Sequence, residues 1–185
     1  RTDALCRWMA ERAGPTFDGR AYVDTGPVQE RVYAQYAGLG WIGKNTCLIN
    51  AERGSWLFLS EVICNLDLPP DEAALDQCGT CTLCLEACPT GALPEPWVLD
   101  ATKCLSYLTI ELKRDVPELQ RDELGAHVFG CDICQDVCPW NSAPTQSLDA
   151  AWVPRPLFDQ PRLLDLWRRS DAELRTAMKG SALRR

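Results

Sequence analysis

The chain has 185 residues, of which 46% are hydrophobic, so it can form an apolar core in one medium domain or two small ones. Its formal net charge of -7 disfavours a general nucleic-acid-binding surface, because neutralising phosphates takes clustered lysine and arginine side chains. No apolar run approaches the ~20 residues of a membrane-spanning helix. The N-terminus also lacks the apolar stretch of a secretory signal, which predicts a cytoplasmic protein.

The first 68 residues predict a mixture of helices and strands. Apolar residues follow helical spacing from Leu5 onward, and Pro27 and Gly38 mark the two ends of a second helix. We expect helices at residues 5–12 and 28–37, and strands at residues 20–24, 46–50 and 56–63. A turn at 52–55 is expected to join the last two strands.

Cysteines rather than hydrophobic periodicity organise the middle of the chain, from residue 77 to residue 140. A proline-containing break at residues 68–71 precedes this region. After Pro144 the composition changes again, and we expect a helix at residues 161–169. A further helix is expected after Ser170, because Ser170-Asp171-Ala172-Glu173 has the sequence of a capping box.

The eleven cysteines predict metal ligands rather than disulfides. Their number is odd, their spacings are tight, and an export signal is lacking, all of which favour reduced thiolates. One run has the C-x2-C-x2-C-x3-C-P spacing of bacterial ferredoxins that bind two 4Fe-4S clusters. This run consists of Cys78, Cys81, Cys84 and Cys88-Pro89.

A second group repeats the end of that run at Cys131, Cys134 and Cys138-Pro139, and Cys104 lies between the two groups. Two 4Fe-4S clusters need eight thiolates, and these positions supply eight. In ferredoxins the fourth cysteine of the run binds the other cluster, which predicts an interleaved assignment. One cluster is assigned to Cys78, Cys81, Cys84 and Cys138, and the other to Cys88, Cys104, Cys131 and Cys134.

Zinc is the alternative metal, since paired C-x-x-C motifs are common in zinc sites. A tetrahedral zinc site, however, has no need of a third closely spaced cysteine or of Cys-Pro endings. Three cysteines outside the pattern, Cys6, Cys47 and Cys64, are interpreted as buried and inert thiols. The single histidine, His127, is interpreted as structural, because no cysteine or carboxylate lies at ligand spacing from it.

More than half of the chain lies outside the cysteine region, so a further ligand or reaction is expected. The glycines of residues 38–45 would allow a bulky ligand to approach the backbone closely. Asp24 lies at a predicted strand end shortly before a helix, where two interpretations remain open. It is either the N-terminal cap of that helix or a general acid kept protonated by burial beside an apolar ligand.

Six motifs are spread over residues 20–141. They are Val23-Asp24-Thr25-Gly26-Pro27, Gly38-Leu39-Gly40-Trp41-Ile42-Gly43-Lys44-Asn45, Gly54-Ser55-Trp56-Leu57-Phe58-Leu59, Cys78-Gly79-Thr80-Cys81, Cys104-Leu105-Ser106-Tyr107-Leu108-Thr109-Ile110-Glu111 and Phe129-Gly130-Cys131-Asp132-Ile133-Cys134-Gln135-Asp136-Val137-Cys138-Pro139-Trp140-Asn141. Together these motifs closely resemble the epoxyqueuosine reductase family. The resemblance implies reduction of epoxyqueuosine to queuosine at the tRNA wobble position. It also implies that electrons pass from an external donor through the two 4Fe-4S clusters to a base-off cobalamin.

The resemblance implies roles for further residues. By position, Asp24 matches the proton donor of the family. Positions near the corrin are matched by Leu48, Asn50, Ser106 and Asp132, although Leu48 is equally interpreted as a core residue and Asn50 as a turn residue. Contacts to the tRNA are expected at Lys113 and Arg114, whose alternative interpretation is a solvated helix end.

The expected fold class is α+β. Residues 1–70 would form the C-terminal part of an α/β cobalamin-binding domain, residues 71–145 a ferredoxin-like two-cluster domain, and residues 146–185 the helical start of a HEAT-like repeat. Since family members extend beyond both ends of this sequence, we expect a fragment, and we expect it to be monomeric. Two alternative functions remain open, a noncatalytic two-cluster electron carrier and another corrinoid-dependent reductase.

Overall fold

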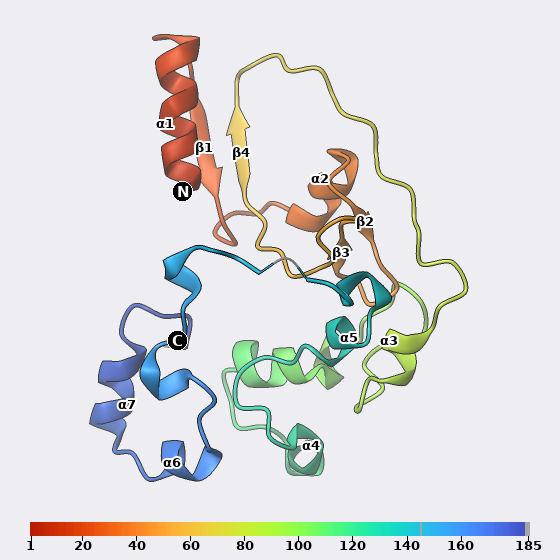
Figure 1. Cartoon of the computed structure of the whole chain (residues 1–185), viewed down its shortest axis with the longest axis vertical. Coiled ribbons are helices and arrows are strands. Elements are labelled where there is room, and N and C mark those ends of the chain that lie inside the picture. The colour runs from red at the N-terminus through yellow and green to blue at the C-terminus, as the bar shows by residue number, and fades with distance from the viewer. Residues whose placement is uncertain (145, 184–185) are drawn as a thin grey trace. The chain divides into compact units, whose positions relative to one another are not determined.

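The computed structural model describes residues 1–144 and 146–183 and divides into two compact units. Unit 1 comprises Arg1–Thr102 and Asp132–Pro144, and unit 2 comprises Lys103–Cys131 and Thr145–Arg185. Figure 1 shows short helices and two small sheets along the chain. The predicted mixture of helices and strands is therefore confirmed.

Unit 1 begins with α1, Thr2–Ala13, which packs against a two-stranded antiparallel sheet (Figure 1). The sheet is formed by β1, Gly19–Tyr22, and β4, Glu61–Cys64. In its register Gly19 lies opposite Cys64. The helix predicted at residues 5–12 and the strand predicted at 20–24 are both confirmed, apart from small shifts of their ends.

The helix predicted at residues 28–37 is α2, Glu30–Tyr36. It ends just before Gly38, whose left-handed φ of 67° is a conformation that glycine adopts at little cost. The helix begins later than predicted, and its N-cap is Gln29. The interpretation of Asp24 as the cap of this helix is therefore wrong.

A second antiparallel sheet consists of β2, Trp41–Ile42, and β3, Leu48–Ile49. The predicted strand at 46–50 is confirmed as the shorter β3, whereas β2 was not predicted. The expected hairpin between residues 46–50 and 56–63 is wrong, because β3 pairs with β2 and β4 pairs with β1.

The chain after β3 forms a tight turn at residues 50–54 instead of continuing into a paired strand. The side-chain oxygen of Asn50 accepts the backbone N–H groups of Glu52 and Arg53, each at 3.0 Å. Asn50 and Gly54 also bond each other through both backbone groups at 2.9 Å. This local turn satisfies the backbone groups that a hairpin would otherwise have paired.

The core of unit 1 lies beside the cysteine segments. Trp41 and Ile49 are each only 1% exposed and form a buried cluster with Cys138. The ring of Trp140 meets Trp41 edge to face, with 4.9 Å between the ring centres. The remaining helical elements of unit 1 are α3 (Leu83–Glu86), α5 (Ile133–Asp136) and the 3-10 turn Pro139–Asn141. A further 3-10 turn, Ala101–Lys103, lies where the chain passes from unit 1 to unit 2.

Unit 2 is helical in its described residues. It contains a π-helical turn at Tyr107–Glu111, α4 (Glu118–Arg121), α6 (Leu163–Trp167), α7 (Asp171–Met178) and 3-10 turns at Asp122–Leu124, Ala150–Trp152 and Pro156–Phe158. The helices predicted at 161–169 and after Ser170 are confirmed as α6 and α7. No helix in the described part of the chain is both long and apolar enough to cross a membrane.

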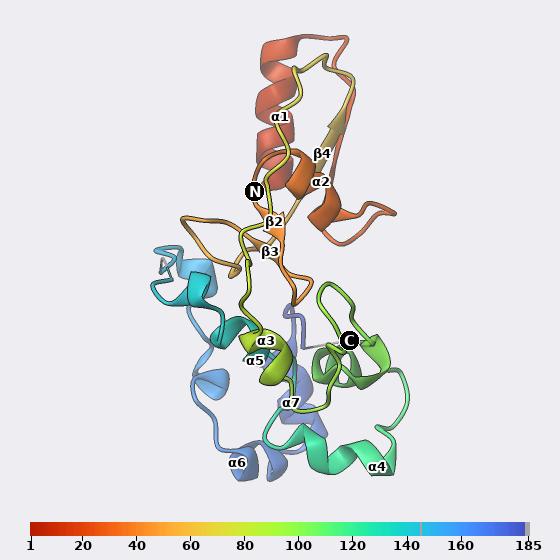
Figure 2. The same ribbon diagram turned by 90° about the vertical axis from the view of Figure 1, so that its right-hand side faces the viewer.

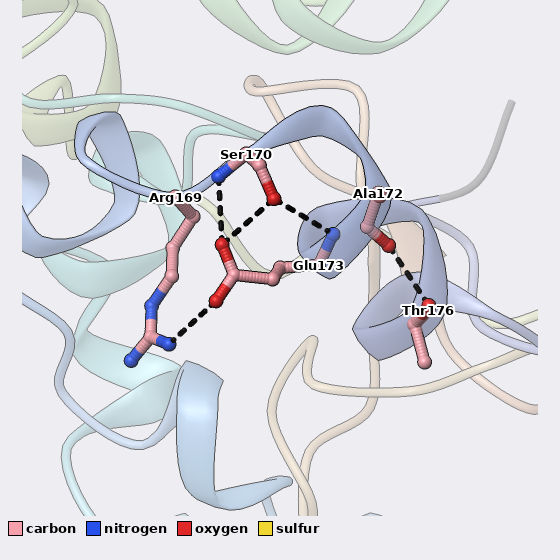
Figure 3. Close-up of polar contacts among 5 residues, drawn as sticks. All are labelled: Arg169, Ser170, Ala172, Glu173 and Thr176. Carbon is pink, nitrogen blue, oxygen red and sulfur yellow. Dashed lines mark hydrogen bonds and ion pairs between the residues drawn. The ribbon is translucent and has the colours of Figure 1, made fainter.

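The capping box predicted at Ser170 is present at the start of α7 (Figure 3). The Glu173 carboxylate accepts the Ser170 N–H at 2.8 Å, and the Ser170 hydroxyl accepts the Glu173 N–H at 3.4 Å. The Ser170 N–H and the Ser170 hydroxyl, which both donate to the Glu173 carboxylate at 2.8 Å, lower the pKa of Glu173. Arg169, which pairs with Glu173 at 3.4 Å, makes a smaller contribution. The box supplies partners for donors that the first helical turn leaves free.

Candidate functional site

Four cysteine side chains of unit 1 line one small cavity of about 40 Å³. They are Cys78, Cys81, Cys84 and Cys138. The other lining residues are Lys44, Asn45, Ile49, Leu83, Pro139 and Trp140. The structure thus brings together the four members of the first cysteine set that the interleaved assignment predicts.

Two short helices position these thiols. Cys84 lies in α3 and Cys138 lies just after α5, and Figure 2 shows α3 and α5 side by side. On the loop before α3, the Cys81 N–H donates to the Cys78 carbonyl at 3.2 Å. Gly79 takes a left-handed φ of 53° within this tight loop, which brings its flanking thiols to the same cavity.

The four thiols of this cavity match the number of protein ligands that an iron-sulfur cube needs. Among the described residues, no group of three or more histidine, cysteine or carboxylate side chains is gathered closely enough to hold one ion. A cube of iron and sulfide binds one thiolate at each of four separate corners, so its ligands need not meet at a point.

A buried donor beside the thiols supports the same fit. The indole N–H of Trp41 is buried and has no hydrogen-bond partner among the residues that the structure describes. Trp41 packs in one cluster with Cys78 and Cys138. An unsatisfied buried donor costs about 1–3 kcal/mol. The sulfur atoms of a cluster would provide acceptors that the protein itself does not place there.

The pKa values of two thiols in this set are shifted upward. Burial raises the pKa of Cys84, and the neighbouring thiols Cys134 and Cys78 raise it further. Burial is also the main cause that raises the pKa of Cys138. Because cluster ligands are thiolates, metal binding at these positions must release protons.

The second predicted set is divided between the two units, with Cys88 and Cys134 in unit 1 and Cys104 and Cys131 in unit 2. Burial acts to raise the pKa of Cys88, yet hydrogen bonds, mainly from Thr90 and Ala92, give a net lowering. The Ala92 N–H donates to the Cys88 sulfur at 3.2 Å. This sulfur is therefore already in an environment that favours a thiolate.

Cys47 is not an isolated core thiol, because it forms a hydrogen bond with Cys134. That bond is the main cause that lowers the pKa of Cys47, while the same bond and burial raise the pKa of Cys134. Cys47 therefore loses its proton more easily than an ordinary thiol, and Cys134 less easily. Sequence spacing alone did not indicate this contact with a predicted cluster ligand.

Two adjacent residues connect the cysteine segments to the sheet of β2 and β3. The Lys44 ammonium donates to the carbonyls of Gly79 and Cys81 at 2.7 and 2.8 Å. The Asn45 amide donates to the carbonyl of Cys134 at 3.2 Å. Neither residue was predicted from the sequence to be part of the site. The sequence feature that indicates them is a charged and a polar residue at the end of a glycine-rich apolar segment.

A buried polar network holds α5 from the other side. The Ser55 hydroxyl donates to the side-chain oxygen of Gln135 at 2.8 Å. The Asn141 amide donates to the backbone carbonyl of Gln135 at 2.8 Å. These bonds fix the short helix α5, which contains Cys134 and precedes Cys138. The helix carries too few backbone hydrogen bonds to be rigid by itself.

Comparison with known proteins shows which proteins the chain resembles. Residues 77–141 match a family model described as a 4Fe-4S double cluster binding domain. The chain is 47% identical over 184 residues to epoxyqueuosine reductase from Synechocystis sp. and 48% identical over 186 residues to the same enzyme from Gloeobacter violaceus. Both alignments cover 98% of this chain. Over nearly its whole length, the chain is therefore similar to epoxyqueuosine reductases.

Solved structures of epoxyqueuosine reductases share the fold. A crystal structure of epoxyqueuosine reductase with an epoxyqueuosine-modified tRNA stem loop has a TM-score of 0.86 and 37% identity over 94% of this chain. The enzyme from Streptococcus thermophilus has a TM-score of 0.83 and 33% identity over 94%. The chain spans 63% and 58% of the two curated relatives, and 46% and 45% of the two solved chains.

The position that resembles the proton donor of epoxyqueuosine reductases lies on the loop between β1 and α2. Asp24 is exposed and has a left-handed φ of 50°, an uncommon conformation that aspartate tolerates better than most residues. Thr25 braces the loop by accepting the Val23 N–H at 3.4 Å. The carboxyl group is thus presented to solvent at a bend in the backbone.

The positions that resemble corrin contacts in the epoxyqueuosine reductase family have different surroundings. Leu48 is buried at 4% exposure in β3, and the side chain of Asn50 is used by its turn, as their alternative interpretations predicted. Asp132 is exposed and accepts the Gln135 amide at 2.9 Å. In unit 2, Ser106 is half-buried directly before the π-helical turn.

Three further side chains singled out in the sequence also belong to unit 2. Lys113 and Arg114 are both exposed in the segment that follows Glu111, where the π-helical turn ends. The ring Nδ1 of His127 lies 3.0 Å from the Leu124 carbonyl. This local bond gives the histidine a structural partner within its own turn.

Proposed function

We propose that this protein reduces epoxyqueuosine to queuosine in tRNA, with electrons that an external donor supplies and two 4Fe-4S clusters carry. The observation that carries the proposal is the thiol-lined cavity in a chain 47% identical to an epoxyqueuosine reductase. Conversion of an epoxide to an alkene consumes two electrons and two protons and releases one water molecule. The protein must therefore deliver both electrons and protons to one substrate.

The cysteines are assigned to the electron-transfer part of the reaction. Cys78, Cys81, Cys84 and Cys138 would hold one cluster, and Cys88, Cys104, Cys131 and Cys134 the other. When bound, the clusters supply one-electron transfer, and cobalamin would supply the metal that reacts with the substrate. The double cluster motif at residues 77–141 supports this assignment.

Asp24 is assigned to the proton-transfer part. Protonation of the epoxide oxygen as the carbon–oxygen bond breaks avoids a high-energy alkoxide. An epoxyqueuosine reductase from Bacillus subtilis has been solved with its catalytic aspartate loop swung out of the active site. We propose that the exposed loop of Asp24 moves likewise, so that bound substrate encloses the carboxyl group.

Cobalamin is proposed on the basis of the family, with Asp132 and Ser106 as its contacts. The side chains of Leu48 and Asn50 do not fit such a role, because the first is buried in the core and the second completes a turn. We further propose a cobalamin-binding domain at residues 1–70, a ferredoxin-like domain at 71–145 and the start of a HEAT-like repeat at 146–185.

The substrate is proposed to be a tRNA that carries epoxyqueuosine. A related enzyme has been solved with an epoxyqueuosine-modified tRNA stem loop, which supports this class of substrate. The net charge of -7 makes broad phosphate binding unfavourable, so recognition should depend on a few cations. The exposed pair Lys113 and Arg114 is proposed to contact the phosphate backbone.

The experiment is a turnover assay under anaerobic conditions. The protein is loaded with iron, sulfide and cobalamin, given a low-potential reductant and a modified tRNA stem loop, and the nucleosides are analysed by mass spectrometry. Formation of queuosine by the wild type, but not by Cys78→Ser, is expected. Clusters that accept electrons without forming queuosine would instead indicate an electron carrier, and turnover of a halogenated substrate would indicate a different corrinoid reductase.

A further inference from the structure

Lys44 is a buried cation with no anionic partner among the described residues. Its exposed fraction is 7%, and lysine is almost never buried to this degree unless it is paired. Two backbone carbonyls, those of Gly79 and Cys81, accept its N–H groups at 2.7 and 2.8 Å. These neutral acceptors satisfy hydrogen bonds but do not supply the negative charge that a buried ammonium group needs.

The missing negative charge is what a cluster in the adjacent cavity would supply. Lys44 lines the cavity together with Cys78, Cys81, Cys84 and Cys138. An iron-sulfur cube with four thiolate ligands carries a net negative charge. Both carbonyls that Lys44 contacts also belong to the loop between Cys78 and Cys81, so the lysine is fastened to the part of the chain that would wrap the cube.

We propose that Lys44 compensates the charge of the cluster held by Cys78, Cys81, Cys84 and Cys138 and thereby raises its reduction potential. The inference rests on the proposed cluster binding and assigns the residue that makes the two clusters unequal. Reduction adds one electron to the cube and therefore one further negative charge. A buried cation beside the cube stabilises this reduced state more than the oxidised one.

The consequence concerns the cluster beside Lys44. This cluster accepts an electron more readily, and retains it longer, than it would without the lysine charge. The polar neighbour Asn45 donates to the backbone carbonyl of Cys134, accepts the Cys47 N–H and carries no charge. The Lys44-Asn45 pair therefore touches both cysteine segments while placing its positive charge beside only the first.

The test is a redox titration monitored by electron paramagnetic resonance on the anaerobically reconstituted chain. Lys44→Met removes the charge and the donors, whereas Lys44→Gln keeps N–H donors without the charge. Both variants should lower the midpoint potential of one cluster and leave the other unchanged. Arg20→Met is the matched control, since it removes one positive charge from an exposed position of unit 1 and should shift neither potential.

A variant that loses a cluster is also informative. Lys44→Arg then shows whether the loss is caused by the missing positive charge. If the Met and Gln variants hold a single cluster while Lys44→Arg holds two, a positive charge is required and the proposal is supported. If none of the three variants retains the cluster, binding requires the particular shape of the lysine side chain rather than a positive charge. The proposal is then overturned. Unchanged potentials in a fully loaded Lys44→Gln protein would overturn it as well.

This experiment is independent of turnover. The potentials are read without cobalamin or tRNA, so a shift caused by Lys44→Gln would stand even if the protein formed no queuosine. Conversely, a wild-type protein that binds no iron would refute the proposed clusters themselves. The two failures are therefore distinguished by the iron content of the wild type.

Discussion

Asn141 holds Ser55 through both ends of its side-chain amide, although 86 positions separate the two residues. The Asn141 oxygen accepts the Ser55 N–H at 2.7 Å, and the Asn141 nitrogen donates to the Ser55 hydroxyl at 2.8 Å. Both residues are 7% exposed. The loop that follows β3 is thereby fixed to the end of the second cysteine group.

Replacing Asn141 with alanine should destabilise unit 1. The change leaves the buried Ser55 N–H and the Gln135 carbonyl without this partner, and each such loss costs ~1–3 kcal/mol of unfolding free energy. Urea titration of the anaerobic protein followed by circular dichroism measures the effect. The neighbouring exposed Ser142→Ala serves as the control, and equal midpoints for the two variants would contradict the structural role of the network.

Gly54→Ala should be more damaging than Gly91→Ala, although both glycines have left-handed φ angles, of 71° and 59°. A Cβ atom at Gly54 would lie 2.0 Å from the side-chain oxygen of Asn141, whereas one at Gly91 meets no atom within 4 Å. Gly91→Ala should cost only the backbone strain of ~1–2 kcal/mol. Urea midpoints of the two variants provide the comparison, and similar losses would mean that the close contact with Asn141 is not maintained.

Local chemistry made part of the fold and site predictable. Gly38 marks the end of α2 because a left-handed residue ends a helix, and Ser170 marks the start of α7 because its hydroxyl caps free N–H groups. The cavity set was predictable for a similar reason. Cys78, Cys81 and Cys84 lie in one short run, and the ferredoxin pattern indicates which distant cysteine joins them.

The remaining features depend on contacts that no local pattern encodes. The hairpin prediction failed because β4 pairs with β1. In the sequence, β1 precedes both strands of the second sheet, and β4 follows them. Lys44 donates to a carbonyl 35 positions away, and Asn45 to one 89 positions away. In the sequence, Lys44 and Asn45 are residue types that usually lie at the surface. Only the structure shows that both are buried beside cysteines.

Cys138→Ser should disturb the cluster of the first cysteine run rather than the one nearer in sequence. Its expected spectroscopic change matches that of Cys81→Ser and differs from that of Cys104→Ser, because Cys138 lines the cavity of Cys81. The wild type should contain about eight iron atoms per chain, and Cys138→Ser fewer. Cys64→Ser is the control outside both sets. Iron analysis and electron paramagnetic resonance check these outcomes, and a change matching that of Cys104→Ser would refute the interleaved assignment.

Lys113→Ala should weaken tRNA binding without altering the clusters. A phosphate contact releases a counterion, so its loss lowers the slope of log affinity against log salt by about one unit. Fluorescence anisotropy with a modified stem loop over a series of salt concentrations measures this slope. Arg7→Ala removes an exposed charge from α1 and should leave the slope unchanged. If both variants bind like the wild type, Lys113 is only a solvated residue.

Asp24→Asn should abolish most of the turnover while leaving the fold intact. Asparagine has nearly the same shape as aspartate and also tolerates the left-handed φ of 50°, so the loop can keep its conformation. Because Gln29 rather than Asp24 caps α2, the substitution removes no helix cap. A change in activity would therefore not arise from destabilisation of that helix.

The size of the Asp24→Asn effect then tests the role of the carboxyl group itself. Loss of a general acid typically lowers the rate by ~10² to 10⁴-fold, because the leaving oxygen must depart without a proton. The assay compares queuosine formation by Asp24→Asn with that by Asp18→Asn, which changes another exposed aspartate of the same segment. Iron content and bound cobalamin should equal those of the wild type in both variants. If a fully loaded Asp24→Asn enzyme formed queuosine at a near-normal rate, the proton would have to come from water or another residue, and Asp24 would lose its catalytic role.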